Sequence, residues 1–225
     1  MAHLIVAVDG MTFQEAKSQG VWDALGDAQK KDLIWGVKIN DMLFGGDPTA
    51  MIASLKKEFN LGVMADVKLH DIPLHMESSM SRLVDAGADI VTVHCSANFR
   101  PQNKELLKYI AGVTALTSFT DLEVKWIYDR STEEIVRAFS DIALMNGYSY
   151  IVGSVKDLGY TKENPLKKIC TGIRPLWHPQ RYDQVRIATL KEAVRSEADY
   201  IVLGRPVLKS ASIADAIEKI STEIS

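Results

Sequence analysis

The sequence predicts an α/β fold, a single-domain (β/α)8 TIM barrel over residues 1–225. Short apolar runs rich in Val and Ile alternate with segments of helical periodicity along the chain. This alternation is typical of parallel strands joined by helical crossovers. It repeats eight times, and eight strands close such a barrel. A length of 225 residues and a hydrophobic share of 47% fit one barrel with a large core.

The expected elements follow this alternation in order. Strands are predicted at residues 4–8, 33–39, 62–67, 89–94, 112–117, 149–153, 168–172 and 200–203. Helices are predicted at residues 12–25, 48–59, 73–86, 101–110, 132–145, 189–196 and 211–224. Pro48, Pro73 and Pro101 stand where the first turn of a helix tolerates proline. A helix within residues 156–166 would be short, because Gly159 and Pro165 interrupt it.

Composition argues against nucleic-acid binding, membrane binding and a cysteine-based site. The net charge of −3 gives no basic excess for binding nucleic acid or an anionic membrane. The chain has neither a signal-like leader nor an apolar run long enough to span a bilayer, so we expect a cytosolic (cytoplasmic) protein. Cys95 and Cys170 lie in apolar strand-like contexts without metal-ligand spacing, and we expect them to be reduced core thiols.

The most informative stretch is residues 65–73, where Asp66, Lys68 and Asp71 form the pattern Asp-x-Lys-x-x-Asp after an apolar run. Side chains alternate between the two faces of a strand, so Asp66 and Lys68 should point to the same side. Buried charges are costly unless they are paired or used. This pair at the end of a strand is therefore a candidate site.

Further charges end other expected strands, where the chemistry of a barrel is found. Lys38 shares a strand face with Gly36 and should point toward the same interior as Asp66 and Lys68. Asp9 follows the first expected strand. A structural ion-pair network at the barrel rim would also account for such charges. The convergence of four ionisable groups of alternating sign favours a functional site.

The last two strands suggest an anion site. Each is followed by a turn that pairs a glycine with an arginine: Gly172 with Arg174, and Gly204 with Arg205. Glycine permits close backbone approach, a helix N-terminus offers free N–H groups, and arginine binds phosphate oxygens through two donors. Many barrels hold a phosphate at this position. Between the turns, the loop 176–186 is long enough to close over a ligand, with Gln184 as a candidate phosphate or carbonyl contact.

Taken together, these motifs resemble the orotidine 5'-monophosphate decarboxylase family across nearly the whole chain. The similar segments, in order, are Val6-Ala7-Val8-Asp9, Val37-Lys38-Ile39, Asp66-Val67-Lys68-Leu69-His70-Asp71-Ile72-Pro73, Leu116-Thr117-Ser118, Gly172-Ile173-Arg174-Pro175, Asp183-Gln184 and Gly204-Arg205-Pro206-Val207. The Asp-x-Lys-x-x-Asp core alone is shared with related phosphate-sugar barrels. The additional segments make the resemblance specific.

The resemblance implies that Lys38, Asp66, Lys68 and Asp71 form an array against the pyrimidine carbon that bears the carboxylate. Loss of carbon dioxide leaves a vinyl carbanion that no adjacent carbonyl can delocalise. Lys68 would stabilise this carbanion and then protonate it. Asp66 and Asp71 would keep Lys68 charged. No metal or organic cofactor is expected.

The resemblance also assigns substrate contacts and an oligomeric state. Lys38 and Asp9 would bind the ribose hydroxyls, Thr117 and Ser118 the pyrimidine, and Arg174, Gln184, Gly204 and Arg205 the phosphate. Asp71 would act in the partner's active site, which implies a homodimer with two shared sites.

Three positions depart from the family pattern. Leu74-His75 stands where the family usually has Asn-Thr, so His75 would replace a threonine that contacts ribose across the dimer. Asn40 replaces a glycine after the second strand, and Thr171 replaces a proline before Gly172. Because none of these positions carries the charged array, we expect changes in affinity rather than in chemistry.

Two alternatives remain open. Magnesium-dependent 3-keto-L-gulonate 6-phosphate decarboxylases and hexulose 6-phosphate synthases share Asp-x-Lys-x-x-Asp but carry an acidic metal ligand where this chain has Lys38. A lysine there would repel Mg²⁺. A non-catalytic barrel that binds a phosphate ligand is the second alternative, and it would be expected to have lost part of the charged array.

Overall fold

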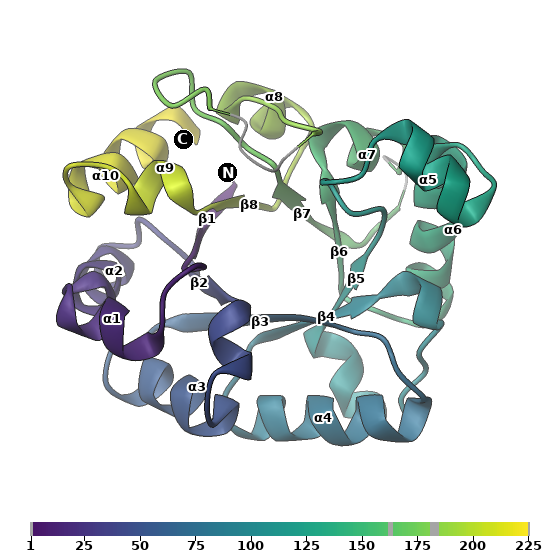
Figure 1. Cartoon of the computed structure of the whole chain (residues 1–225), viewed down its shortest axis with the longest axis horizontal. Helices are drawn as coiled ribbons and strands as arrows, with labels where there is room; N and C mark the ends of the chain where they lie inside the picture. Colours follow the sequence, from purple (N-terminus) through teal and green to yellow (C-terminus); the bar gives the residue numbers. More distant parts are fainter. Residues whose placement is uncertain (1, 162–163, 181–184, 225) are drawn as a thin grey trace.

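Eight parallel strands close into a barrel in the order β1 to β8, with helices around the outside (Figure 1). This computed structural model describes residues 2–161, 164–180 and 185–224. The predicted (β/α)8 fold is confirmed. The strands are β1 (His3–Ala7), β2 (Gly36–Ile39), β3 (Gly62–Leu69), β4 (Ile90–His94), β5 (Ile110–Val113), β6 (Tyr150–Ser154), β7 (Lys167–Thr171) and β8 (Tyr200–Leu203).

The fifth strand differs most from its prediction. The segment predicted as a helix at 101–110 is instead the 3-10 helix η3 (Lys104–Tyr109), and β5 begins directly after it. β5 ends at Val113, so residues 114–117, which were predicted to continue the strand, lie beyond its end at the rim of the barrel. The apolar run extends past the end of the strand, which explains why its pattern placed the strand too late.

The helices mostly match their predicted positions. They are α1 (Phe13–Ser18), α2 (Val21–Lys30), α3 (Pro48–Lys57), α4 (Pro73–Asp85), α5 (Asp121–Tyr128), α6 (Thr132–Met145), α7 (Val155–Gly159), α8 (Leu190–Arg195), α9 (Arg205–Leu208) and α10 (Ile213–Ile224), with 3-10 turns η1 (Asp41–Phe44) and η2 (Cys95–Ala97). The single helix predicted at 12–25 is wrong, because Gly20 at φ +70° separates α1 from α2. α5, which was not predicted, starts at a capping box formed by Thr120 and Glu123.

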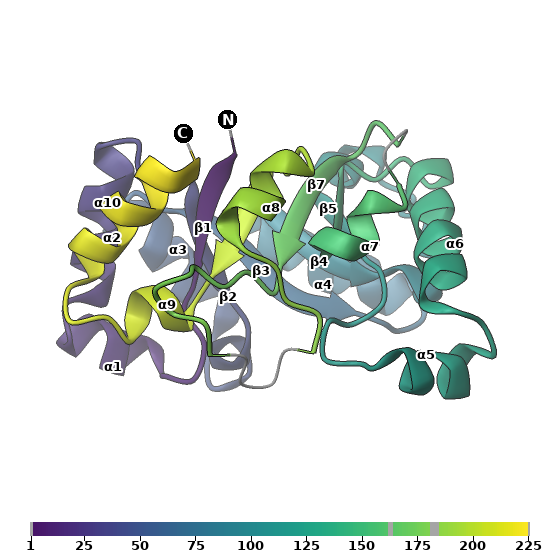
Figure 2. The ribbon, with the colours of Figure 1, turned by 90° about the horizontal axis from the view of Figure 1, so that it is seen from above.

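Figure 2 shows the barrel from the side, with the start of β1 and helix α5 at opposite ends. Among the described residues, no helix has the length and apolar character that a membrane crossing requires.

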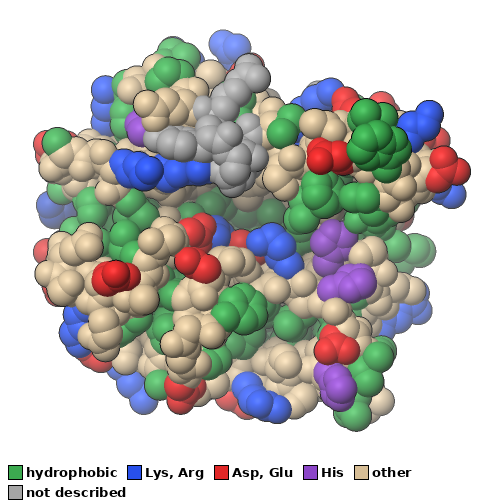
Figure 3. Space-filling view, in the orientation of Figure 1, with side chains coloured by type: hydrophobic (Ala, Val, Ile, Leu, Met, Phe, Trp, Pro, Cys, Tyr) green, Lys and Arg blue, Asp and Glu red, His purple; other side chains and the backbone are tan. Residues whose placement is uncertain are grey.

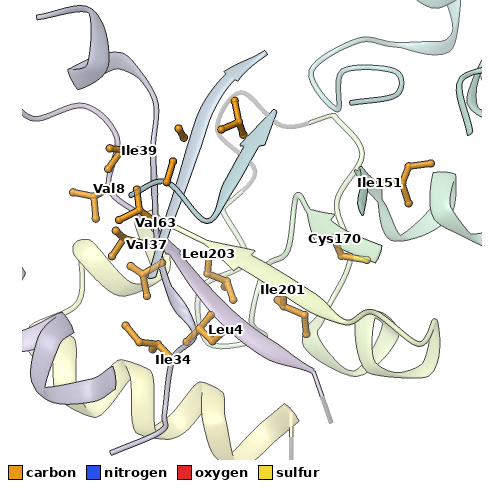
Figure 4. Packing of buried hydrophobic residues seen from close by; sticks show 14 of the residues in the cluster. Leu4, Val8, Ile34, Val37, Ile39, Val63, Ile151, Cys170, Ile201 and Leu203 are labelled. Carbon is orange, nitrogen blue, oxygen red and sulfur yellow. The ribbon is translucent and has the colours of Figure 1, made fainter. Parts of the chain in front are cut away.

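The core has two layers that follow from strand alternation. Side chains such as Ile5, Met64 and Ile90 fill the barrel interior. Val37 and Leu203 belong to the larger cluster between the strands and the surrounding helices (Figure 4). This inward and outward alternation carries polar side chains into the open end of the barrel.

Candidate active site

A cavity of about 650 Å³ opens at the carboxyl ends of the strands. Acidic and basic side chains gather in the middle of this face (Figure 3). Most of the predicted site residues line the cavity: Asp9, Lys38, Asp66, Lys68, Thr117, Ser118, Arg174, Gly204 and Arg205. Asp71 and His75 do not line it. Gln184 lies outside the described residues.

Asp9, Lys38, Asp66 and Lys68 form a row of alternating charges on the wall of the cavity. The Nζ of Lys38 lies 3.1 Å from Oδ2 of Asp66, and the Nζ of Lys68 donates to the same oxygen at 2.9 Å. Lys38 also donates to both carboxylate oxygens of Asp9, at 3.0 and 2.9 Å. Each charge therefore lies beside one of opposite sign.

This pairing sets the protonation states of the two most buried groups. Burial would lower the pKa of Lys38, but Asp66 and Asp9 outweigh it and raise that pKa above the usual range. Burial would raise the pKa of Asp66, but Lys38 and Lys68 outweigh it and lower that pKa. The Lys38 and Asp66 side chains are 9% and 10% exposed, whereas that of Lys68 is 35% exposed. Lys68 is thus the most accessible of the three to a bound molecule.

The charged end of β3 is not a regular strand. Ala65 pairs with Val91 and Leu69 with Val93, so four residue steps on β3 correspond to two on β4. Within this bulge Lys68 has φ +45°, a left-handed conformation that few non-glycine residues adopt. The side chain of Lys68 therefore reaches the cavity from a bulged strand, whereas the sequence predicted simple alternation.

Two side chains that the sequence did not assign to a function hold this bulge. The Oγ1 of Thr92 accepts a hydrogen bond from the Lys68 N–H at 2.8 Å and donates to Oδ1 of Asp66 at 2.9 Å. The Nδ2 of Asn40 donates to the backbone carbonyl of Asp66. A signal for Thr92 was available, since it is a polar residue at an inward position of an apolar strand.

A histidine lies close to the same end of β3. The ring of His94 makes T-shaped contacts with the rings of His70 and Phe139, at centroid distances of 5.8 and 5.7 Å. Its Nδ1 lies 2.6 Å from Ser96 Oγ. Burial, together with the charges of His70 and Lys68, lowers the pKa of His94 to about 4. His94 is therefore a neutral imidazole at physiological pH.

Asp71 and His75 lie at the beginning of α4, outside the cavity. Oδ1 of Asp71 accepts from the Ile72 N–H at 2.6 Å and lies 3.6 Å from Nδ1 of His75. The two side chains are 59% and 62% exposed, and the apolar Ile72 and Leu74 beside them are 56% and 75% exposed. Among the described residues, no ion pair joins Asp71 to Lys68 of its own chain.

The two predicted anion turns require glycine for different structural reasons. Gly172 has φ +74°, which favours glycine. Gly204 has an ordinary φ, but a Cβ there would lie 2.9 Å from the carbonyl oxygen of Ala7. The close passage of the chain after β8 along β1 therefore requires glycine at 204.

Cationic side chains from the same turns also line the cavity. Arg174 is buried, and its Nε donates to the Gln180 carbonyl at 2.7 Å, so it supports its own loop as well as facing the cavity. Arg205 begins α9 and lines the cavity together with Lys209. The sequence did not single out Lys209, which directly follows the last residue of α9.

Arg186 supports the turn after β5, residues 114–117. The sequence had indicated no role for Arg186 beyond its place at the end of the loop 176–186. Its N–H donates to the Thr117 carbonyl at 3.2 Å, and its Nη2 donates to the Ala115 and Leu116 carbonyls at 3.0 and 2.7 Å. Its Nε lies 3.3 Å from Oδ2 of the fully buried Asp157. Arg186, at the end of the loop 176–186, therefore contacts the turn that carries Thr117.

In the described part of the chain, no three His, Cys, Asp or Glu side chains are grouped so that they could hold a metal ion.

The sequence matches the model of the orotidine 5'-phosphate decarboxylase / HUMPS family over residues 2–220. The chain belongs to this family. The orotidine 5'-phosphate decarboxylase of Campylobacter jejuni subsp. doylei is 33% identical over 202 residues, which cover 85% of this chain and 88% of the relative. That of Nautilia profundicola is 34% identical over 186 residues, covering 76% of this chain and 80% of the relative.

Solved structures of the family have the same fold. The crystal structure of orotidine 5'-phosphate decarboxylase from Lactobacillus acidophilus superposes with a TM-score of 0.80 at 24% identity, covering 100% of both chains. The orotidine 5'-monophosphate decarboxylase of Methanocaldococcus jannaschii, solved with the inhibitor BMP, gives a TM-score of 0.76 at 22% identity and covers 100% of this chain and 99% of that one.

The three departures from the family pattern lie in different places. Asn40 and Thr171 both line the cavity. Asn40 supports the backbone of Asp66, and the Thr171 hydroxyl lies 3.4 Å from the Gly153 carbonyl that accepts from it. His75 lies outside the cavity beside Asp71. Two of the departures therefore change the wall of the site while leaving the row of charges in place.

Proposed function

We propose that this protein decarboxylates orotidine 5'-monophosphate to uridine 5'-monophosphate and carbon dioxide, a step of de novo pyrimidine biosynthesis. The observation that carries the proposal is that Lys38 and Lys68 both contact one carboxylate oxygen of Asp66 inside a cavity with arginines at its rim. Family membership and relatives named as orotidine 5'-phosphate decarboxylases support it.

Lys68 performs the central chemistry in this proposal. The bond between the pyrimidine carbon and its carboxylate breaks, its electron pair remains on the ring carbon, and carbon dioxide leaves. The Lys68 ammonium stabilises the developing carbanion and then transfers a proton to it. The neutral amine regains a proton from water. Lys68 suits this role because it is more exposed to the cavity than Lys38.

Asp66 and Lys38 orient Lys68. Asp66 carries its charge at neutral pH, because its two lysine neighbours lower its pKa. Its Oδ2 accepts from the Lys68 ammonium at 2.9 Å and holds it in place before the substrate binds, so little reorganisation is needed when the carbanion forms. Lys38 balances the buried charge of Asp66, and with Asp9 it binds the ribose hydroxyls.

Other residues of the site bind the remainder of the nucleotide. Thr117 and Ser118 contact the pyrimidine. The phosphate is bound by Arg174, Gln184, Gly204 and Arg205, of which Gln184 is proposed from the sequence alone. Phosphate binding energy, released far from the reacting carbon, helps to close the loop 176–186 and lower the barrier.

We further propose a homodimer in which Asp71 completes the partner's array. Asp71 lies outside the cavity of its own chain and is 59% exposed. The exposed apolar side chains of Ile72 and Leu74 follow it in the chain and provide surface for a subunit contact. His75 lies on the same segment, where it can donate a hydrogen bond to the ribose in the partner's site.

The second candidate function is a magnesium-dependent reaction on a hexulose or keto-gulonate phosphate, since the matched family also includes HUMPS members. Lys38 argues against it, because an ammonium with a raised pKa stands where such members carry an acidic metal ligand.

A spectrophotometric assay tests the proposal. The purified chain should consume orotidine 5'-monophosphate, with loss of its absorbance, equally well before and after exhaustive treatment with a chelator. Keto-gulonate and hexulose phosphates should not react. Turnover of those sugars that depends on added Mg²⁺ would instead assign the second candidate function. Binding of nucleotide without turnover of any of these substrates would indicate a phosphate-ligand binding barrel.

A further inference from the structure

The hydroxyl of Thr92 is buried between the two charged residues of β3. Thr92 points inward from the middle of β4 and has no exposed surface. An ionised carboxylate only accepts hydrogen bonds, so the single hydroxyl proton of Thr92 is donated to Oδ1 of Asp66, at 2.9 Å. A lone pair of the same oxygen accepts from the Lys68 N–H at 2.8 Å.

Each of these bonds fixes a different part of the array. With Oδ1 held by Thr92, the other Asp66 oxygen is directed at both ammonium groups, 3.1 Å from Lys38 and 2.9 Å from Lys68. The bond to the Lys68 N–H supplies a partner for a backbone group that lies in the bulge of β3. It thereby supports the left-handed conformation from which the Lys68 side chain extends.

We propose that Thr92 is a positioning residue that sets the location of the Lys68 ammonium relative to the substrate, by orienting Asp66 and the Lys68 backbone together. This inference rests on the proposed decarboxylase function. It assigns Thr92 no contact with substrate, since Thr92 does not line the cavity. Its loss should therefore slow the chemical step and leave nucleotide binding nearly unchanged.

Thr114 provides a matched control. It is also a fully buried threonine, directly after the last residue of β5, and its hydroxyl donates to the Val152 carbonyl at 2.9 Å. It does not line the cavity or contact a charged residue of the array. Thr92→Val and Thr114→Val thus each remove one buried hydroxyl, and they differ in whether that hydroxyl contacts the array.

The kinetic test compares kcat and KM for orotidine 5'-monophosphate. Thr92→Val should lower kcat by ~10- to 100-fold with KM changed by less than about threefold. Thr92→Ser, which keeps the hydroxyl, should recover most of kcat, and Thr114→Val should retain it. Equal kcat for the two valine variants, or no recovery with serine, would overturn the proposal. If Thr92→Val does not fold, Thr92→Ala is compared with Thr92→Ser by the same criteria.

Amide hydrogen exchange gives a readout that is independent of activity. The Lys68 amide should exchange faster in Thr92→Val than in the wild type, Thr92→Ser and Thr114→Val, because only Thr92→Val removes its acceptor. Unchanged exchange at Lys68 would overturn the proposal even if the wild type proves inactive. An active wild type with normal kcat in Thr92→Val would refute only the role of Thr92, whereas an inactive wild type would refute the proposed function.

Discussion

Replacing Lys38 with Met should destabilise the protein far more than replacing Lys68 with Met. Lys38 lies between the carboxylates of Asp9 and Asp66, so its removal leaves two acidic groups with no cation between them. Removing Lys68 leaves Lys38 in place between the same two carboxylates. Both variants change the net charge by the same amount, and they differ only in which lysine of the row is replaced.

The expected size follows from burial. Breaking a buried ion pair costs ~3–5 kcal/mol, and we expect the lower end for Lys38→Met because Lys68 still contacts Asp66. For a chain of this length, ~3 kcal/mol lowers Tm by roughly 6–12 °C. Lys68 is 35% exposed, so Lys68→Met should cost no more than ~1 kcal/mol, or less than about 4 °C.

Thermal unfolding followed by circular dichroism measures both variants. Lys30→Met is the control for loss of a lysine, because Lys30 pairs with Asp27 at 2.9 Å on the surface, where both side chains are about two-thirds exposed. It should change Tm little. A Tm for Lys68→Met as low as that for Lys38→Met would refute the view that the buried lysine holds the row of charges together.

Three further predictions concern the phosphate, the dimer and pH. Arg205→Ala should raise KM for the nucleotide strongly but change kcat/KM little for a substrate without phosphate. Neither the wild type nor the variant can make the bidentate contact to a substrate that lacks the phosphate. Equal losses with both substrates would show that Arg205 has a structural role. Lys38→Ala chains mixed and reassembled with Asp71→Ala chains should regain activity, since one pocket of each heterodimer carries neither change; demonstrated heterodimers without activity would place Asp71 in its own chain's site. The pKa of His94 is about 4 in the folded protein, against an ordinary value of 6.5. As the pH decreases from 6.5 toward 4, the unfolded state therefore binds a proton that the folded state does not, and the free energy of unfolding should fall. The urea midpoint of His94→Gln should fall less from pH 7 to pH 5 than that of the wild type, and parallel decreases would contradict this.

The strands and the row of charges could be predicted because they depend on short periodicities. Alternation along β2 places Val37 and Ile39 against the helices, and thus Lys38 toward the interior, whatever the rest of the chain does. The helix break at Gly20 and the early start of β5 were missed. In both places an apolar pattern continues across the true boundary, so hydrophobic pattern alone does not locate it.

The supporting residues of the site depend on tertiary contacts that no local pattern encodes. Thr92 contacts Asp66 and Lys68 only because β3 is bulged against β4. Arg186 reaches the rim turn after β5 from a loop about 70 residues later in the chain. The exposure of Asp71 is likewise a property of the folded chain. It is the feature that supports the proposal that Asp71 acts in a site shared across a dimer interface.

The most direct test of the central role of Lys68 is release of carbon dioxide from orotidine 5'-monophosphate labelled at its carboxylate, measured alongside uridine 5'-monophosphate formation. The wild type should form both products in equal amounts. Lys68→Ala should be folded, as judged by thermal unfolding, and slower by at least ~10³-fold, because it lacks both the charge that stabilises the carbanion and the proton that quenches it. Release of carbon dioxide by Lys68→Ala at close to the wild-type rate would contradict the account.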